Sequence, residues 1–301
     1  MNNKKILIVG GSGFIGYHLA KRSLEKNWKV TSISSNSPKK IRYLSKVKYI
    51  RCDITNKKLL KKKIQEPFDY VVNLGGYVDH SNKKKTYKSH YEGCKNLAEI
   101  FLTKKLLSFI QIGSSLEYGI SNSPQKEKIK CNLKSIKSVY GKAKLLSTLY
   151  MINLFKKKNF PATVLRLYQV YGPKQDTNRF LPITITGCLK NKKFPCSTGN
   201  QMRDFTYVDD VVEAVIKSLI NKNARGQIIN IGTGKPRVIK KVIEKVKKIS
   251  KGGYPQYGMF KQRKFEIPTL YPNVEKAKNK IDWKSKTPFE KGLKKTIRSY
   301  K

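Results

Sequence analysis

The sequence predicts an α/β fold, a doubly wound parallel sheet covered by helices on both faces and joined to a smaller C-terminal lobe. Two observations predict it: short apolar segments alternate with amphipathic stretches of helical period, and the last third is broken by Pro/Gly-rich turns at 252–255 and 267–272. We expect strands over residues 5–9, 29–34, 48–52, 70–74, 108–113 and 162–167, and helices over 14–26, 90–104 and 138–158.

Composition narrows the class of protein. The 301 residues are 39% hydrophobic, which is enough for a sizeable core, and no apolar run approaches the length of a membrane span. The start of the chain leads directly into the first strand without the apolar region of a secretory signal, so we expect a cytoplasmic protein. The five cysteines form no CxxC pair, which predicts neither a disulfide framework nor a metal site.

The chain is strongly basic, with 65 Lys and Arg against 19 Asp and Glu and a net charge of +46. Lysines are spread over nearly every segment instead of forming one stripe, and arginines do not alternate with aromatic residues as in a single-strand channel. We therefore do not expect nucleic acid as a partner. The same charge would attract a diphosphate substrate.

A glycine pattern follows the first strand, where residues 6–16 read ILIVGGSGFIG. Gly10 permits a tight turn, Gly13 lets the backbone approach a pyrophosphate, and Gly16 lets the helix lie close to the strand. The pyrophosphate then meets the helix N-terminus, where free N–H groups favour an anion. The pattern predicts a Rossmann-type dinucleotide site formed by Gly10, Gly13, Phe14, Ile15 and Gly16.

The end of the second strand bears on the choice of cofactor. A carboxylate there would bind the 2′-hydroxyl of the adenosine ribose and select NAD, but this chain has Ser34. Lys39, Lys40 and Arg42 follow closely and could hold a 2′-phosphate. The sequence favours NADP, with NAD as the alternative.

Two further strand ends contribute to the expected cofactor site. Asp53, followed by Ile54, could accept a hydrogen bond from the adenine amino group, although a turn or helix-cap role fits the same pattern. Leu74 and Gly75 close the fourth strand, where small residues leave room for the cofactor.

Tyr140 and Lys144 lie four residues apart on an expected helix and therefore on one face. A nearby cation lowers the pKa of a phenol, which allows it to exchange a proton, and the lysine can also hold ribose hydroxyls. Ser114 ends a strand, where its hydroxyl can hydrogen-bond a reacting oxygen. The three residues form an expected catalytic set.

Together these motifs resemble the extended short-chain dehydrogenase/reductase family, in its nucleotide-sugar epimerase, dehydratase and reductase group. The resemblance covers nearly the whole chain and continues through LRLYQVYGP at 165–173, RDFTYVDD at 203–210, NIGTG at 230–234 and IDWK at 281–284. The part from Arg166 through Arg263 is also similar to CDP-dideoxyhexose 4-ketoreductases of the abequose-synthase type.

The resemblance implies further residue roles. Arg203 and Arg263 would hold the diphosphate of a nucleotide-diphosphate sugar, Arg179 and Phe180 would line the nucleotide site, and Glu266 would lie near its ribose. It also implies a homodimer formed by the helices at 90–104 and 138–158. Residues 1–166 plus 205–233 would form the dinucleotide-binding domain, and 167–204 plus 234–301 the nucleotide-sugar lobe.

Three positions depart from the family pattern. Dehydratases follow the catalytic hydroxyl with an acid–base pair, whereas this chain has Ser115 and Leu116, with Glu117 one residue late. Elimination of water would lack its proton carriers. His90 stands where many relatives have asparagine, and Gln169 replaces asparagine before Val-Tyr-Gly.

Two reactions fit the same catalytic set. A reductase would pass hydride from NADPH to a 4-keto sugar, and an epimerase would oxidise the C4 hydroxyl with bound NAD and return the hydride to the other face. Ser34 favours the NADPH-dependent reductase, with the NAD-dependent 4-epimerase as the alternative. A more distant alternative is a catalytically silent relative that binds RNA, whose affinity would fall steeply with salt.

Overall fold

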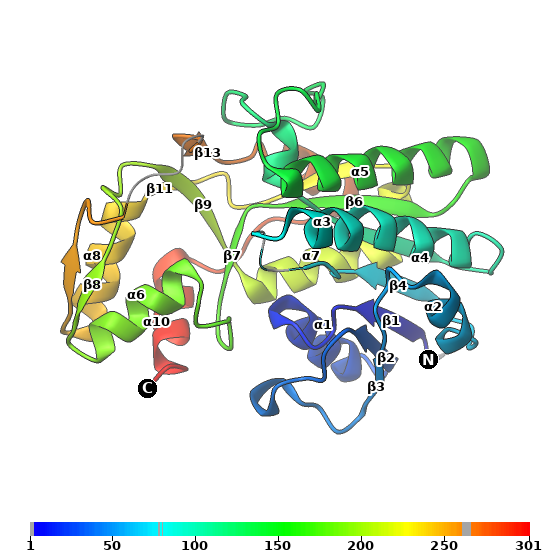
Figure 1. Cartoon of the computed structure of the whole chain (residues 1–301), viewed down its shortest axis with the longest axis horizontal. Helices are drawn as coiled ribbons and strands as arrows, with labels where there is room; N and C mark the ends of the chain where they lie inside the picture. Colours follow the sequence, from blue (N-terminus) through cyan, green and yellow to red (C-terminus); the bar gives the residue numbers. More distant parts are fainter. Residues whose placement is uncertain (1–2, 78, 80, 261–265) are drawn as a thin grey trace.

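The computed structural model describes residues 3–77, 79, 81–260 and 266–301 (Figure 1). Its main body contains a seven-stranded sheet in the order β10-β6-β5-β4-β1-β2-β3, in which every neighbouring pair is parallel. This arrangement confirms the predicted fold class. The strands are β1 (Lys5–Val9), β2 (Lys29–Ser34), β3 (Val47–Arg51), β4 (Tyr70–Asn73), β5 (Ser108–Ser114), β6 (Ala162–Leu167) and β10 (Ile228–Ile231).

Helices cover both faces of this sheet because successive strand side chains point to opposite sides. Ile6 and Ile8 pack in the core beneath α1 (Phe14–Glu25) and α7 (Val208–Ile220). Leu7 and Val9 pack in the other core, under helices that include α2 (Lys57–Lys63), α4 (Gly93–Phe101) and α5 (Val139–Lys158). The short 3₁₀ turns η1 (Lys40–Arg42), η3 (Ser115–Tyr118) and η4 (Lys222–Ala224) lie in the connections.

The helix expected over 90–104 has different bounds in the structure. It starts with α3 (Lys83–Tyr87), passes through the π-helical turn η2 (Lys88–Glu92), and ends with α4 at Phe101. The Asn82 side chain caps α3 by accepting a hydrogen bond from the Lys85 backbone at 2.9 Å. Three consecutive lysines in this first turn carry no apolar period, so the sequence pattern could not show the start.

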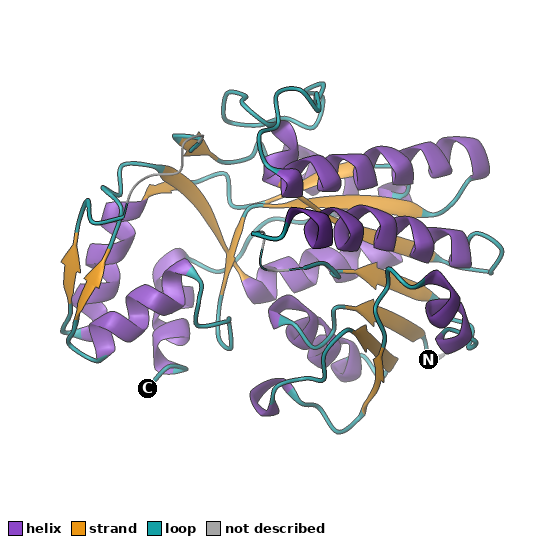
Figure 2. Cartoon of the chain, viewed as in Figure 1, coloured by secondary structure: helices purple, strands orange, loops and turns teal. Residues whose placement is uncertain are grey.

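A smaller lobe lies beyond the carboxyl ends of the strands (Figure 2). In it β9 (Met202–Tyr207) pairs with β7 (Gln169–Tyr171), β11 (Pro236–Val238) and β13 (Thr269–Leu270), while β8 (Lys193–Pro195) pairs with β12 (Tyr254–Gln256). The helices α6 (Phe180–Leu189), α8 (Ile239–Ser250) and α10 (Phe289–Arg298) share its separate apolar core.

The chain returns once more to the main body near its C-terminus. Helix α9 (Glu275–Ile281) contacts β10 and α7, and Ala277, Ile281 and Trp283 belong to the core beneath α7. The Trp283 indole donates to the backbone oxygen of Asp210 at 2.9 Å. The segment after the smaller lobe therefore completes one face of the larger half.

In the described ranges, no helix combines the length and apolar character needed to cross a bilayer.

Candidate active site

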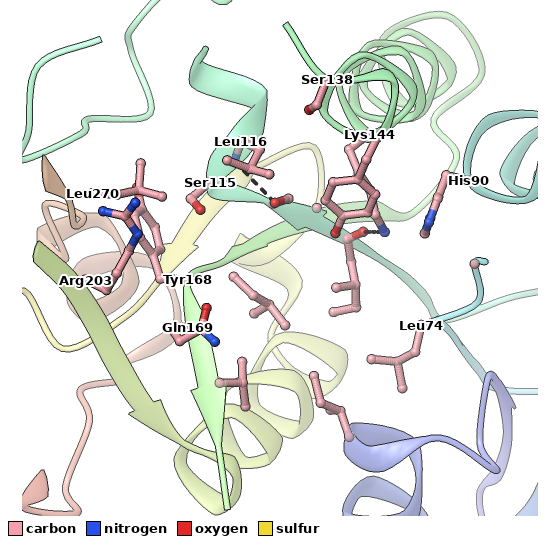
Figure 3. Close-up of a pocket in the computed structure, with 18 of the residues that line it drawn as sticks. Leu74, His90, Ser115, Leu116, Ser138, Lys144, Tyr168, Gln169, Arg203 and Leu270 are labelled. Atoms are coloured by element: carbon pink, nitrogen blue, oxygen red, sulfur yellow. Dashed lines mark hydrogen bonds between the residues drawn. The ribbon is translucent and has the colours of Figure 1, made fainter. Parts of the chain in front are cut away.

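A cleft of about 680 Å³ lies between the two lobes, at the carboxyl ends of the central strands (Figure 3). Ligands bind at this edge in doubly wound folds because adjacent loops diverge there and leave a crevice. Residues from both lobes line the cleft, so that one ligand can contact the glycine loop and the smaller lobe together.

The glycine loop fits a dinucleotide pyrophosphate. Gly10 has a φ of +80°, and a Cβ on Gly16 would lie 2.3 Å from the Gly10 carbonyl oxygen, so only glycine allows α1 to approach this closely. Gly13 caps α1 without a side-chain hydrogen bond, which leaves the first turn open to an anion. The expected cofactor residues that line the cleft are Gly10, Gly13, Phe14, Ile15, Gly16 and Leu74, together with Tyr140 and Lys144 from the catalytic set.

Four other expected cofactor residues lie outside this lining: Ser34, Asp53, Ile54 and Gly75. Asp53 accepts a hydrogen bond from the Thr55 backbone at 2.9 Å, which is the turn role left open by the sequence. Ile54 and Gly75 pack together, because a Cβ on Gly75 would lie 3.1 Å from the Ile54 side chain. Ser34 lies beside the glycine loop and accepts from the Ser12 backbone at 3.3 Å.

The expected catalytic residues meet at the base of the cleft. The Ser138 hydroxyl caps α5 by accepting from the Gly141 backbone at 3.0 Å, which places Tyr140 in the first turn and Lys144 one turn later. Lys144 is 3% exposed, and its Nζ donates to the Ile112 carbonyl at 2.6 Å (Figure 3). Ser114 ends β5 and lines the same cleft.

Burial sets the protonation of the two α5 residues. It raises the pKa of Tyr140 to about 12, against the lowering effects of a hydrogen bond with Ser114 and the charge of Arg179. Burial also lowers the pKa of Lys144 to about 8, despite the opposing charge of Glu117. Desolvation is the largest influence on the pKa of Tyr140, and the Nζ of Lys144 lies 5.8 Å from the centroid of its ring.

Glu117 supports Ser114 from behind the cleft. It is completely buried, and its Oε1 accepts from the Ser114 backbone N–H at 2.7 Å. Its Oε2 accepts from Thr148 at 2.7 Å and from the Arg166 guanidinium at 2.8 Å. The Ser114 hydroxyl in turn accepts from the Leu116 backbone at 3.2 Å, which completes a capping box. Glu117 therefore positions the serine and does not face the cleft.

The other two departures from the family pattern do line the cleft. His90 is buried, its ring lies edge-on to the Tyr140 ring with centroids 4.9 Å apart, and its Nε2 is 3.2 Å from the Tyr77 carbonyl. Gln169 opens β7 opposite them. Figure 3 shows His90 beside Lys144 and Gln169 across the cleft.

Most residues expected to hold a nucleotide sugar lie on the smaller-lobe side. Arg179, Arg203 and Glu266 line the cleft, and Arg203 forms an ion pair with Glu266. Phe180 does not line it and packs instead against Phe205, with ring centroids 6.1 Å apart. Arg263 lies outside the described residues.

Several lining residues were not expected to belong to the site, chiefly Tyr168, Asp176 and Leu270, whereas Ser115 and Leu116 line it at the positions of the missing acid–base pair. Tyr168 directly follows β6, and the rule that sites form at the carboxyl ends of parallel strands could have found it. Its hydroxyl donates to Gln125 at 2.8 Å. In the part of the chain that the structure describes, no three His, Cys, Asp or Glu side chains gather to hold a metal ion.

The NAD dependent epimerase/dehydratase family matches residues 6–232, which include the glycine loop, Ser114, Tyr140 and Lys144. The chain belongs to this family. Among its curated relatives, a UDP-N-acetyl-alpha-D-glucosaminuronate decarboxylase of Bacillus cytotoxicus is 25% identical and covers 99% of this chain and 98% of its own. A putative UDP-glucose 4-epimerase of Methanocaldococcus jannaschii is 28% identical and covers 97% of both chains.

Solved structures of epimerases share the fold of this family member over nearly its whole length. A UDP-glucose 4-epimerase of Thermotoga maritima with UDP-glucose has a TM-score of 0.92 at 25% identity and covers 98% of both chains. A UDP-glucuronic acid 4-epimerase of Bacillus cereus, in complex with UDP-glucuronic acid and NAD, has a TM-score of 0.87 at 26% identity, again over 98% of both chains. The neighbours of this chain thus act on or bind nucleotide sugars.

Proposed function

We propose that the protein interconverts a nucleoside-diphosphate sugar and its C4 epimer through a bound nicotinamide dinucleotide. The observation that carries the proposal is one cleft with the glycine loop on one wall, Ser114, Tyr140 and Lys144 at its base, and Arg179 and Arg203 on the other wall. Relatives named as 4-epimerases match over nearly their whole length and support this reaction, although a decarboxylase relative matches over a similar length.

The residues present fit a dinucleotide at the glycine loop, which when bound would supply an acceptor and donor of hydride. Tyr140 would remove the proton of the C4 hydroxyl and later return it, while Ser114 hydrogen-bonds the same oxygen. Because burial raises the pKa of Tyr140 to about 12, its deprotonation needs a positive charge nearby, which the oxidised cofactor would bring. Lys144 uses one of three N–H donors on Ile112 and would offer others to ribose hydroxyls.

The arrangement around Ser114 disfavours elimination of water. Leu116 faces the cleft, and the carboxylate of Glu117 is committed to Ser114, Thr148 and Arg166. Because this carboxylate does not line the cleft, it is not placed to exchange a proton with a sugar bound there.

The experiment is to incubate the purified enzyme with UDP-glucose, UDP-N-acetylglucosamine and UDP-glucuronic acid and follow inversion at C4 by proton NMR. We expect at least one of these sugars to reach an equilibrium mixture of epimers without added cofactor. If none of these sugars is inverted at C4, the same assay is run with dTDP-, CDP- and GDP-sugars. Absence of inversion in all of them would contradict the proposal.

A second candidate is the NADPH-dependent reduction of a 4-keto sugar, and Ser34 is the observation that favours it. With no carboxylate at the end of β2, nothing at that position repels a 2′-phosphate. The dinucleotide released from the denatured protein separates the two reactions. Retained NAD supports the epimerase, whereas consumption of added NADPH by a 4-keto sugar nucleotide supports the reductase.

Lys144→Ala is expected to lower both turnover and cofactor affinity, because one cation serves the phenol and the ribose. With the pKa of Lys144 lowered to about 8, the wild-type lysine is charged below that pH and neutral above it. Cofactor affinity of the wild type should therefore weaken as the pH rises from 7 to 9, and that of the variant should not. Titration by protein fluorescence at each pH measures both, and equal affinity of variant and wild type at pH 7 would remove the ribose role.

We also propose that the protein is a homodimer formed through α4 and α5. Among the apolar side chains on α5, Leu145 is buried within its own chain, whereas Leu149 is 51% exposed and available for an interface. Leu149→Lys is expected to shift the molecule from dimer to monomer in size-exclusion chromatography with light scattering, because it places a charge in an apolar contact. Ile220→Lys, at a residue 57% exposed on the opposite face of the sheet, is the matched control and should remain dimeric. A monomeric wild type at micromolar concentration would refute the dimer.

A further inference from the structure

A carboxylate from the smaller lobe occupies the cations that follow β2. Asp176, in the loop between β7 and α6, accepts from Lys39 at 3.1 Å and pairs with the Arg42 guanidinium at 3.0 Å. The side chain of Arg42 is 4% exposed, and its Nε also donates to the Lys174 carbonyl at 2.9 Å. Two of the three cations that could reach a 2′-phosphate are therefore bound to the other lobe.

This contact lies at the end of the cofactor site where NAD and NADP differ. The 2′ position of the adenosine ribose belongs at the end of the second strand, and Ser34, at that end, contacts the glycine loop through Ser12. Asp176 itself lines the cleft together with Gly10, Gly13 and Phe14. Its ion pairs thus connect the loop after β2 to the wall of the cofactor cleft.

We propose that Asp176 is the residue that selects NAD over NADP in this chain, in place of the carboxylate missing at Ser34. It neutralises Lys39 and Arg42, so that a 2′-phosphate would have to compete with it for both cations. The phosphate would also bring a charge of about −2 towards a carboxylate. The 2′-hydroxyl of NAD carries no charge, so it neither competes with Asp176 for the two cations nor is repelled by it.

A purely structural role for Asp176, in joining the two lobes, makes a different prediction. The same loop is attached to the larger half by contacts that do not involve Asp176. Lys174 donates to the Tyr17 hydroxyl at 2.7 Å, and the His18 Nε2 lies 3.0 Å from the Pro173 carbonyl. Removing the charge of Asp176 should leave this attachment in place.

The test is to titrate NADH and NADPH separately into the wild type and Asp176→Asn and to follow cofactor fluorescence. In this variant Lys39 and Arg42 are released from Asp176 and can contact the 2′-phosphate. A charge-assisted contact of this kind is worth roughly 1.5–3 kcal/mol, so NADPH affinity should rise by roughly ten- to a hundredfold. NADH affinity should stay within about twofold, since Arg42 keeps the Lys174 carbonyl as a partner and the loop stays attached through Lys174 and Pro173. Asp69→Asn is the matched control, because Asp69 is 28% exposed against 30% for Asp176 and also pairs with a lysine, Lys4 at 2.9 Å.

Two further variants separate selection from a general effect of charge. Lys39→Gln added to Asp176→Asn should remove most of the gain in NADPH affinity, and Asp176→Glu should keep the wild-type preference. An unchanged ratio of the two affinities in Asp176→Asn, or an equal loss of both, would overturn the inference. The inference rests on the proposed dinucleotide site but not on the sugar reaction. If the wild type binds neither cofactor, the proposed function is contradicted. If it binds them and Asp176→Asn leaves the preference unaltered, only the role of Asp176 is contradicted.

Discussion

Tyr140→Phe is expected to lose turnover by roughly 10²–10⁴-fold, the usual contribution of a positioned proton donor or acceptor. The change removes one hydroxyl and leaves the ring, so its edge-on contact with His90 and the packing of α5 should persist. Cofactor affinity should therefore remain at the wild-type level. Steady-state kinetics and a dinucleotide titration on the same preparation measure both quantities.

The matched control for this variant is Tyr150→Phe, which removes a phenol hydroxyl from the same helix. The Tyr150 hydroxyl contacts Glu99 at 3.5 Å and does not line the cleft, so this variant should turn over as the wild type does. Full activity in Tyr140→Phe would show that another group moves the proton.

Glu117→Gln is expected to destabilise the fold by about 3–5 kcal/mol, because it leaves a buried guanidinium without its counter-charge. Arg166 is 2% exposed, and its carboxylate partner is completely buried. The stacking of Arg166 over the Tyr118 ring, at 4.4 Å from the centroid, is present in both proteins and does not replace the lost counter-charge. The midpoint of urea unfolding, monitored by circular dichroism, should fall well below that of the wild type.

Glu290→Gln provides the comparison for that measurement. Glu290 also pairs with cations, Lys245 at 3.1 Å and Lys294 at 3.3 Å, but its side chain is 51% exposed. Exposed ion pairs contribute about 0–1 kcal/mol, so its unfolding midpoint should stay close to that of the wild type. Equal midpoints for the two variants would mean that solvent reaches the buried pair.

Much of the main sheet could be predicted because its strands are continuous apolar runs bounded by polar turns. The expected and observed strands agree at both ends for β1, β2 and β6, and differ by a single residue at one or both ends for β3, β4 and β5. The start of α3 could not be predicted, since capping by Asn82 and not apolar periodicity defines it. The smaller lobe was predicted only in outline, because its strands are short and pair with distant segments.

The candidate site also has a part that the sequence predicts and a part that it does not. Gly10, Tyr140 and Lys144 occur in local patterns whose spacing places them on one turn or one helix face, and the sequence shows such patterns directly. The pairing of Lys39 with Asp176 joins positions 137 residues apart, and the sequence shows only that a cation and an acid exist. Lys39 and Arg42 therefore looked available for a phosphate until the fold brought Asp176 to them.

The return of α9 to the larger half has a consequence for how the protein is made. Ala277, Ile281 and Trp283 complete the core beneath α7, yet in sequence they follow the smaller-lobe elements β11, α8, β12 and β13. A growing polypeptide exposes its N-terminal segments first, so this core face stays open until residues 277–283 have been synthesised. The half that contains the glycine loop therefore completes its own core only after the intervening segments of the smaller lobe have been made, so the two halves are not independent in the order of synthesis.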